Sequence, residues 1–186
     1  MSLAAYLGLL YLVSEALLIV ARRSRQSADS TKDAGSLRLL WIVILVSILL
    51  GVNLSRRWPV AALPHQHVFA VVGFVIFIVG LILRWYSIIQ LGRFFTVNVA
   101  IAEDHELIES GPYRWVRHPS YTGALLAFLG FGFSLGNWLA LLVIMVPIFF
   151  AFGYRMNVEE RALRSALGDR YTSYTRRTKR LVPFIY

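Results

Sequence analysis

The chain has 186 residues, of which 58% are hydrophobic, and its mean hydropathy is +0.62. This composition excludes an ordinary soluble domain and predicts one polytopic membrane domain over residues 1–186. The absence of cysteine excludes disulfides, thiolate metal sites, iron–sulfur clusters and a cysteine nucleophile. The formal net charge of +9 indicates Lys and Arg that face anionic lipid on the cytoplasmic side, rather than a nucleic-acid-binding surface.

The first 91 residues predict three transmembrane helices. The first covers residues 3–21 and is followed by Arg22 and Arg23, which indicates a retained helix rather than a cleaved signal. A polar loop over 22–36 leads to the second helix at 37–54, and a short loop at 55–66 leads to the third helix at 67–91. Gly92 is expected to end the third helix.

Several polar residues of this region have more than one interpretation. Glu15 lies inside the first helix, where a carboxylate is a candidate functional residue. It can equally be protonated and hydrogen-bonded in the bundle, or lie near a helix end, and this second interpretation is favoured. Arg84 and its two aromatic neighbours are expected to snorkel to the membrane interface. His65 and His67 form a pair without a third ligand nearby, so an interfacial position is favoured over a metal site.

Residues 119–154 carry no charged residue and no histidine. One membrane crossing needs about 20 residues, so this 36-residue run predicts two short helices joined by a tight turn at Gly136-Asn137. Four glycines in the run suit close helix packing: Gly123, Gly130, Gly132 and Gly136. The resulting fold is all-α, with about five transmembrane helices and a C-terminal helical hairpin. It places 17 of the 19 Lys and Arg residues on one side of the membrane, as the positive-inside rule favours.

The stretch 109–123, ESGPYRWVRHPSYTG, is a polar and conformationally constrained passage between two apolar runs. Gly111-Pro112 predicts a turn, and His118-Pro119 predicts the start of a helix. Two arginines and two aromatic residues lie between these pairs. A basic, aromatic loop at the mouth of a membrane helix indicates a binding site, and the alternative is a positively charged anchor at the membrane edge.

The fifth helix is predicted to continue beyond the membrane after Tyr154 and to end near Gly168, where a short helix over 169–177 follows. Arg155 and Glu159 lie one turn apart on one face of its extension. Taken alone, they are an ordinary i, i+4 ion pair. We hypothesise that they face the cytoplasmic loop across one pocket, to which the loop contributes Asn98, His105, Tyr113, His118 and Tyr121.

Two segments, LGRFFTVNVAIAEDHELIESGPYRWVRHPSYTG and RMNVEERALRSALGDRYTSYTRRTKRLVPFI, resemble the isoprenylcysteine carboxyl methyltransferase family and the related membrane phospholipid methyltransferases. The resemblance covers residues 91–185, and the pattern GPY…RHPSYTG…EE…G..Y..Y is specific as an ensemble. It implies that residues 92–186 are the cofactor-binding, catalytic half of a membrane methyltransferase. It further implies S-adenosylmethionine as cofactor, a lipid or prenylated substrate, and no metal.

The resemblance also assigns residues by matching position. The cofactor is expected to contact a set of loop residues and one residue of the fifth helix: Asn98, His105, Leu107, Ile108, Tyr113, His118, Pro119, Ser120, Tyr121 and Glu159. Asn98 stands where the eukaryotic carboxyl methyltransferases carry Gln. Arg155 matches the arginine proposed to orient the substrate carboxylate, so Arg155 and Glu159 are the expected catalytic residues.

Other functions stay open at this point. A carboxylate acceptor is already ionised at neutral pH and needs no general base. A phospholipid amine would need to be neutral, and Glu159 or His118 would then be a candidate base. A small isoprenoid acid is a third acceptor, and an NADPH-dependent sterol reductase or a non-enzymatic scaffold would be a different class of protein. The expected membrane is the inner membrane of a prokaryote or the endoplasmic reticulum of a eukaryote, with the active site facing the cytoplasm.

Overall fold

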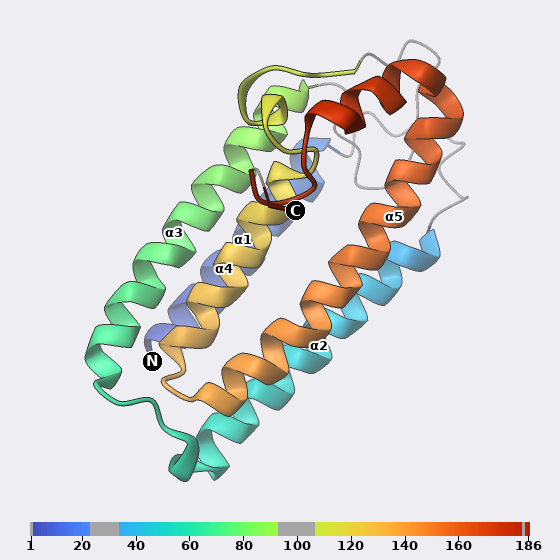
Figure 1. Cartoon of the computed structure of the whole chain (residues 1–186). Coiled ribbons are helices and arrows are strands. Elements are labelled where there is room, and N and C mark those ends of the chain that lie inside the picture. The colour runs from blue at the N-terminus through green and yellow to red at the C-terminus, as the bar shows by residue number, and fades with distance from the viewer. Residues whose placement is uncertain (1, 23–33, 93–106, 184) are drawn as a thin grey trace.

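The computed structural model describes residues 2–22, 34–92, 107–183 and 185–186. These residues form an all-helical fold, as predicted, with the helices arranged as in Figure 1. The α-helices are α1 (Leu3–Arg22), α2 (Ala34–Arg57), α3 (Gln66–Leu91), α4 (Pro119–Ser134) and α5 (Trp138–Arg177), and the two 3-10 helices are η3 (Pro59–Ala61) and η5 (Gly111–Arg114). The sequence RFFTVNVAI at 93–101 also predicts an extended segment, which lies outside the described residues.

Most predicted boundaries are confirmed to within a few residues. Gly92 ends α3 with a positive φ of 53°, as expected of a glycine after a helix. The prediction for α2 was too short, because the helix starts at Ala34 and ends at Arg57 rather than covering 37–54. Its polar ends can be helical because the backbone hydrogen bonds of a helix do not depend on the hydrophobicity of its side chains.

Within the described parts of the chain, three helices are long and apolar enough to span a membrane by themselves: α2 over Gly35–Arg57, α3 and α5. The apolar part of α1 covers Leu3–Leu18, and α4 has 16 residues. A helix of that length reaches about 24 Å, less than the roughly 30 Å of a bilayer hydrocarbon core. Five α-helices are present among the described residues, of which α2, α3 and α5 have the length and composition of membrane spans, and α1 and α4 are the short members.

Helices α3 and α4 form one closely packed pair, α2 and α5 form another, and α1 packs against the first pair (Figure 1). Glycines bring the α3 and α4 backbones together. A Cβ atom on Gly123 would lie 2.5 Å from the Arg84 nitrogen, and one on Gly80 would lie 2.6 Å from the Ala127 nitrogen. This confirms the role expected of Gly123 and shows that α3 supplies small residues as well.

The tight turn predicted at Gly136-Asn137 connects α4 to α5. Gly136 has a φ of 61°, which favours glycine, so it serves the turn rather than helix packing. The Asn137 side chain caps α5 by accepting a hydrogen bond of 3.0 Å from the Ala140 nitrogen. Its amide nitrogen donates to the carbonyl of Trp58 at 2.9 Å, which holds the α4–α5 turn against the end of α2.

Arg84 does not snorkel, and that prediction was wrong. Its Nε and Nη2 donate to Oε1 and Oε2 of Glu15 at 2.6 and 2.8 Å, while the neighbouring Trp85 donates to Ser14 at 2.7 Å. The side chains of Arg84 and Glu15 are only 11% and 8% exposed. A buried bidentate partner offsets much of the cost of keeping the guanidinium inside the bundle. Glu15 is thus hydrogen-bonded in the bundle, as favoured, and it ties α1 to α3.

At the other end of α3, His65 and His67 are both exposed, and their interfacial position stays a prediction. Over 2–22, 34–92, 107–183 and 185–186, no group of three or more His, Cys, Asp or Glu residues could hold a metal ion.

At the C-terminal side, Gly168 interrupts α5 with φ 52° and ψ −127°. The fifth helix therefore ends where predicted, and a short helix turns back toward the bundle (Figure 1).

Candidate active site

The turn around η5 is packed between α3 and the tail helix, which is the part of α5 after Gly168. Gly111 begins it with a φ of 58°, a conformation that favours glycine. The Tyr113 hydroxyl donates to the carbonyl of Ser87 on α3 at 3.2 Å, and the Tyr113 carbonyl accepts a 2.6 Å hydrogen bond from the Tyr174 hydroxyl. Tyr113 thus connects the turn to both neighbouring elements.

Residues 179–181, which we call the strap, run alongside the His-Pro turn. The backbone nitrogens of Arg117 and His118 donate to the carbonyls of Lys179 and Arg180 at 2.7 and 3.0 Å. The Lys179 nitrogen in turn donates to the carbonyl of Trp115 at 3.1 Å. These bonds fix the backbone of the turn immediately before α4 begins.

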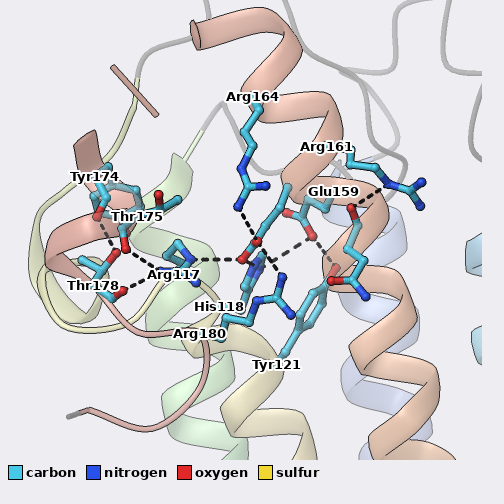
Figure 2. Close-up of polar contacts among 12 residues, drawn as sticks. Arg117, His118, Tyr121, Glu159, Arg161, Arg164, Tyr174, Thr175, Thr178 and Arg180 are labelled. Carbon is cyan, nitrogen blue, oxygen red and sulfur yellow. Dashed lines mark hydrogen bonds and ion pairs between the residues drawn. The ribbon is translucent and has the colours of Figure 1, made fainter. Parts of the chain in front are cut away.

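Glu160 is the centre of a buried charge cluster, and three of its partners, Arg117, His118 and Arg180, lie close together in Figure 2. Its Oε1 accepts from Nε of Arg117 at 3.0 Å and lies 3.2 Å from Nε2 of His118. Its Oε2 accepts from Arg180 at 2.9 Å, and Arg164 approaches the same oxygen at 3.5 Å. Glu160 therefore joins α5, the strap and the His-Pro turn in one network.

The charge of Glu160 is set by its partners. The residue is 1% exposed and lies in the charged extension of α5, beyond the apolar part of the helix. Burial alone would raise the pKa of its carboxyl, but hydrogen bonds from His118, Arg180 and Arg117 outweigh burial and hold the pKa well below its usual range. Glu160 is therefore ionised at neutral pH and fixes the side chains around it.

Next to this cluster, His118, Tyr121 and Glu159 are in direct contact. The Tyr121 hydroxyl donates to Oε2 of Glu159 at 2.8 Å, and Nδ1 of His118 lies 3.9 Å from the same oxygen. The two rings are stacked, with centroids 5.4 Å apart and planes at 9°. The Glu159 side chain is 32% exposed, and its Oε1 accepts no hydrogen bond from the described residues. A partly exposed carboxylate beside stacked rings can bind a cationic, hydrogen-bonding ligand.

Arg155 lies one helical turn before Glu159 and is only 2% exposed. Its Nη1 donates to the hydroxyl of Ser36, in the first turn of α2. The buried guanidinium therefore holds α2 and α5 together next to the carboxylate of Glu159. A guanidinium also offers the planar donor geometry that matches a carboxylate.

The predicted site residues have different environments. His118, Tyr121 and Glu159 meet, and Pro119 is buried at the start of α4. Ser120 instead presents its carbonyl to Nη1 of Arg84 at 3.4 Å. Leu107 and Ile108 are half-buried, and Tyr113 donates its hydrogen bond to α3. Among the described residues, these three form no hydrogen bond with His118, Tyr121 or Glu159 that the structure shows. Asn98 and His105 lie outside the described residues.

Sequence reasoning missed Glu160 and its cationic partners, Arg117 and Arg180. The signal was present in the Glu159-Glu160 pair, because consecutive helix residues point about 100° apart and face different neighbours. It also missed the buried hydroxyl of Tyr171, for which no hydrogen-bond partner exists among the described residues. No periodicity marks such a group, since its environment depends on how the tail helix folds back.

The chain is similar to known proteins in sequence and in fold. The sequence profile of the isoprenylcysteine carboxyl methyltransferase (ICMT) family matches residues 71–165. Protein-S-isoprenylcysteine O-methyltransferase A of Arabidopsis thaliana is 32% identical over 143 residues, which are 76% of this chain and 68% of that protein. A probable protein-S-isoprenylcysteine O-methyltransferase of Oryza sativa subsp. indica is 28% identical over 174 residues, covering 92% of this chain and 90% of the relative.

Other relatives are longer than this chain. The match to Protein-S-isoprenylcysteine O-methyltransferase B of Arabidopsis thaliana is 35% identical over 115 residues, covering 61% of this chain and 58% of that protein. The structure of the eukaryotic intramembrane Ras methyltransferase ICMT superposes with a TM-score of 0.74 at 28% identity. It covers 96% of this chain and 64% of the solved chain, so the helical fold is shared almost throughout.

Proposed function

This chain belongs to the isoprenylcysteine carboxyl methyltransferase family, a family of membrane methyltransferases, and on that basis we propose that it methylates the carboxylate of an isoprenylcysteine-like lipid with S-adenosylmethionine as the methyl donor. Its relatives are named O-methyltransferases of isoprenylcysteine. The chain is a multi-pass integral membrane protein. The reaction is assigned to the cytoplasmic side, where the distribution of Lys and Arg is expected to place the loop and the tail.

The hydrogen bond between Tyr121 and Glu159 is the observation that carries the proposal. It brings the first turn of α4, directly after the His-Pro turn, to the charged extension of α5, although the two residues are 38 positions apart. A methyltransferase site in the membrane needs a place where a water-soluble donor meets a lipid headgroup. The contact between Tyr121 and Glu159 lies where the uncharged helix α4 begins, at such a boundary.

The residues present fit the cofactor. When bound, S-adenosylmethionine supplies a methyl group carried on a sulfonium sulfur. The partly exposed ring of Tyr121 can attract a cation, and the partly exposed carboxylate of Glu159 can accept from an ammonium or hydroxyl group. The buried Tyr171 hydroxyl, which lacks a partner among the described residues, is a further polar atom close to the same charge cluster. Leu107, Ile108, Tyr113, Pro119 and Ser120 complete the proposed cofactor set, with Asn98 and His105 from the segment outside the described residues.

Arg155 is proposed to orient the substrate carboxylate. Its guanidinium is permanently charged and held by Ser36, so it can bind an anion with little loss of side-chain freedom. A carboxylate is ionised at neutral pH, which removes the need for a general base. The protein's contribution is then alignment, since holding two reactants in attack geometry can lower a barrier by several kcal/mol.

The proposal can be tested with the full chain reconstituted in lipid nanodiscs. Radiolabelled S-adenosylmethionine is supplied with N-acetyl-S-farnesylcysteine, phosphatidylethanolamine or a free prenoic acid. The expected product is a base-labile methyl ester formed on the farnesylcysteine. Stable methyl label on phosphatidylethanolamine would instead identify an amine methyltransferase, and an ester on the prenoic acid alone would identify a different acceptor.

Calorimetry with S-adenosylmethionine and with NADPH forms the second part of the test. Binding of S-adenosylmethionine and no binding of NADPH are expected. The reverse result would contradict the proposed function and would favour a reductase. The Arg170→Ala variant serves as the control, because the Arg170 side chain is exposed and is not among the residues assigned to the site.

A further inference from the structure

Residues 181–183 and 185–186, which we call the C-terminal loop, carry exposed apolar side chains. Val182, Ile185 and Tyr186 are 42%, 77% and 45% exposed. The loop is nevertheless well tied, because the carbonyl of Tyr186 accepts hydrogen bonds from the nitrogens of Leu181 and Val182 at 2.6 and 2.7 Å. A fixed loop that presents aliphatic and aromatic side chains outward is unfavourable in water and needs an apolar environment.

The depth of this loop along the bundle is set by its contact with α4. The hydroxyl of Thr122 donates to the carbonyl of Leu181 at 2.8 Å. Thr122 belongs to the first turn of α4, where the uncharged run 119–154 begins. The loop therefore lies beside the level at which α4 enters the bilayer. Figure 1 shows the chain turning down from the tail helix so that its C-terminus lies next to the upper turns of α4.

Cationic side chains precede these apolar residues in the chain. Arg176 and Lys179 are exposed just before the loop, and Arg177, also exposed, pairs with Glu109 at 3.1 Å. The guanidinium of Arg180 lies 5.9 Å from the ring centre of Tyr186, next to the carboxylate of Glu160. Aliphatic and aromatic side chains flanked by Arg and Lys are typical of segments that lie in the interface of an anionic membrane.

We propose that Val182, Ile185 and Tyr186 insert into the acyl–headgroup boundary of the leaflet that α4 enters, and that the adjacent cations bind anionic phospholipid headgroups. This contact with the membrane fixes the position of the strap. The strap carbonyls accept hydrogen bonds from the backbone nitrogens of Arg117 and His118, so they fix the His-Pro turn in the same way. Anionic lipid therefore orders the His-Pro turn from outside the bundle. The occupant is the lipid surface rather than a protein partner, because the loop is fixed beside a membrane helix and the flanking charges match anionic headgroups.

Because the native chain has no cysteine, the loop can be labelled at single positions. Val182→Cys and Ile185→Cys are labelled with an environment-sensitive fluorophore in nanodiscs that contain lipids with a nitroxide near the headgroup. Phe150→Cys is the positive control, since Phe150 is 70% exposed within the apolar part of α5. Ser173→Cys, exposed on the tail helix, is the control for a position in water.

The loop labels are expected to be quenched several-fold more strongly than the label at position 173. Equal quenching at 173, 182 and 185 would overturn the proposal. Accessibility to a water-soluble quencher should show the opposite order. This measurement does not depend on methyl transfer, so its outcome is separate from that of the proposed function.

Hydrogen exchange tests the link from the lipid to the turn. The amides of Arg117 and His118 are expected to exchange about five-fold more slowly in nanodiscs with anionic lipid than in neutral ones, the scale of one Lys or Arg near an anionic surface. The double variant Val182→Asp/Ile185→Asp should lose this difference, whereas Ser173→Asp should keep it. Identical exchange in both lipids for the native chain would overturn the coupling.

Discussion

The hydroxyl of Tyr121 lies 2.8 Å from Oε2 of Glu159, so the first turn of α4 is hydrogen-bonded to the charged extension of α5. The ring of Tyr121 is simultaneously stacked on His118 and packed against Phe152, with ring centres 5.4 and 5.1 Å away. Tyr121 therefore has two separable roles. Its ring fills the space between two helices, and its hydroxyl sets the direction of one carboxylate.

Replacing Tyr121 by Phe should separate these roles. The substitution keeps the stacked ring and removes the hydroxyl, which leaves Glu159 free to rotate toward water. A hydrogen bond to a charged group contributes about 1.5–3 kcal/mol, so we expect binding of S-adenosylmethionine to weaken by at least about tenfold. Calorimetry measures the affinity, and Tyr154→Phe, which changes an exposed tyrosine, is the matched control. Unchanged affinity in Tyr121→Phe would contradict the role of Glu159 in the proposed pocket.

Arg155→Lys should affect turnover rather than cofactor affinity. Lysine keeps the positive charge but loses the planar donor pair that matches a carboxylate. We expect kcat with the farnesylcysteine substrate to fall by about tenfold or more, with the affinity for S-adenosylmethionine within about twofold of the native value. Ser36→Ala is the control, because it removes the hydroxyl that accepts from Arg155 and leaves the guanidinium in place. If Ser36→Ala reproduced the loss of kcat, Arg155 would act through the α2–α5 contact and not on the substrate.

The sequence predicts features that depend on neighbouring residues better than contacts between residues far apart in the chain. The hairpin turn at Gly136-Asn137 and the helix end at Gly92 follow from local conformational preferences and are confirmed. The pairing of Arg84 with Glu15 was not predicted, because it joins residues 69 positions apart and depends on the packing of α1 against α3. Periodicity and charge indicate which residues are unusual, but they do not indicate which distant side chains will meet.

The same distinction applies to the candidate site. The motif identified His118, Tyr121 and Glu159 as a group, and the structure brings these three together. The Glu159-Glu160 pair indicated that Glu160 has different neighbours from Glu159, but the motif did not identify the strap as its partner, since that contact forms only after Gly168 interrupts α5. Networks that depend on a chain reversal become visible only in the folded structure.

Glu160→Gln is expected to destabilise the protein. The amide keeps the size of the side chain but removes the negative charge that Arg117, Arg180 and His118 face in a buried site. Breaking a buried charge cluster on one side costs about 3–5 kcal/mol. Thermal unfolding in detergent should show a clear decrease in Tm. Asp169→Asn, which removes an exposed carboxylate on the same tail, should leave Tm nearly unchanged.

Glu160 also predicts how stability depends on pH. Its pKa is lower in the folded than in the unfolded chain, so its contribution to the free energy of unfolding is fully present above the unfolded pKa of a glutamate and decreases as the pH falls below it. Acid titration of the native chain should therefore lower Tm more steeply than titration of Glu160→Gln. Parallel curves for the two proteins would show that Glu160 does not gain its charge stabilisation from the fold.

The ion pair between Glu15 and Arg84 predicts a specific pattern of coupling. Arg84→Met alone leaves a buried carboxylate without its partner, and Glu15→Leu alone leaves a buried guanidinium. Each single variant is expected to lose about 3–5 kcal/mol, while the double variant should recover part of that loss because no unpaired charge remains. Unfolding measurements on all four proteins give the coupling energy. Additive losses would show that the two charges are stabilised independently.

Two glycines test the contact between α3 and α4 with a matched pair of substitutions. A Cβ on Gly123 would lie 2.5 Å from the backbone nitrogen of Arg84 and 2.6 Å from the carbonyl oxygen of Gly80. A Cβ on Gly153 in α5 would have no atom within 4 Å outside its own helix. Gly123→Ala must push the two backbones apart, so a decrease in Tm is expected. Gly153→Ala gains helix propensity of about 1 kcal/mol at no steric cost and should raise Tm. The opposite signs are diagnostic, because a general sensitivity of the membrane helices to substitution would shift both variants in the same direction.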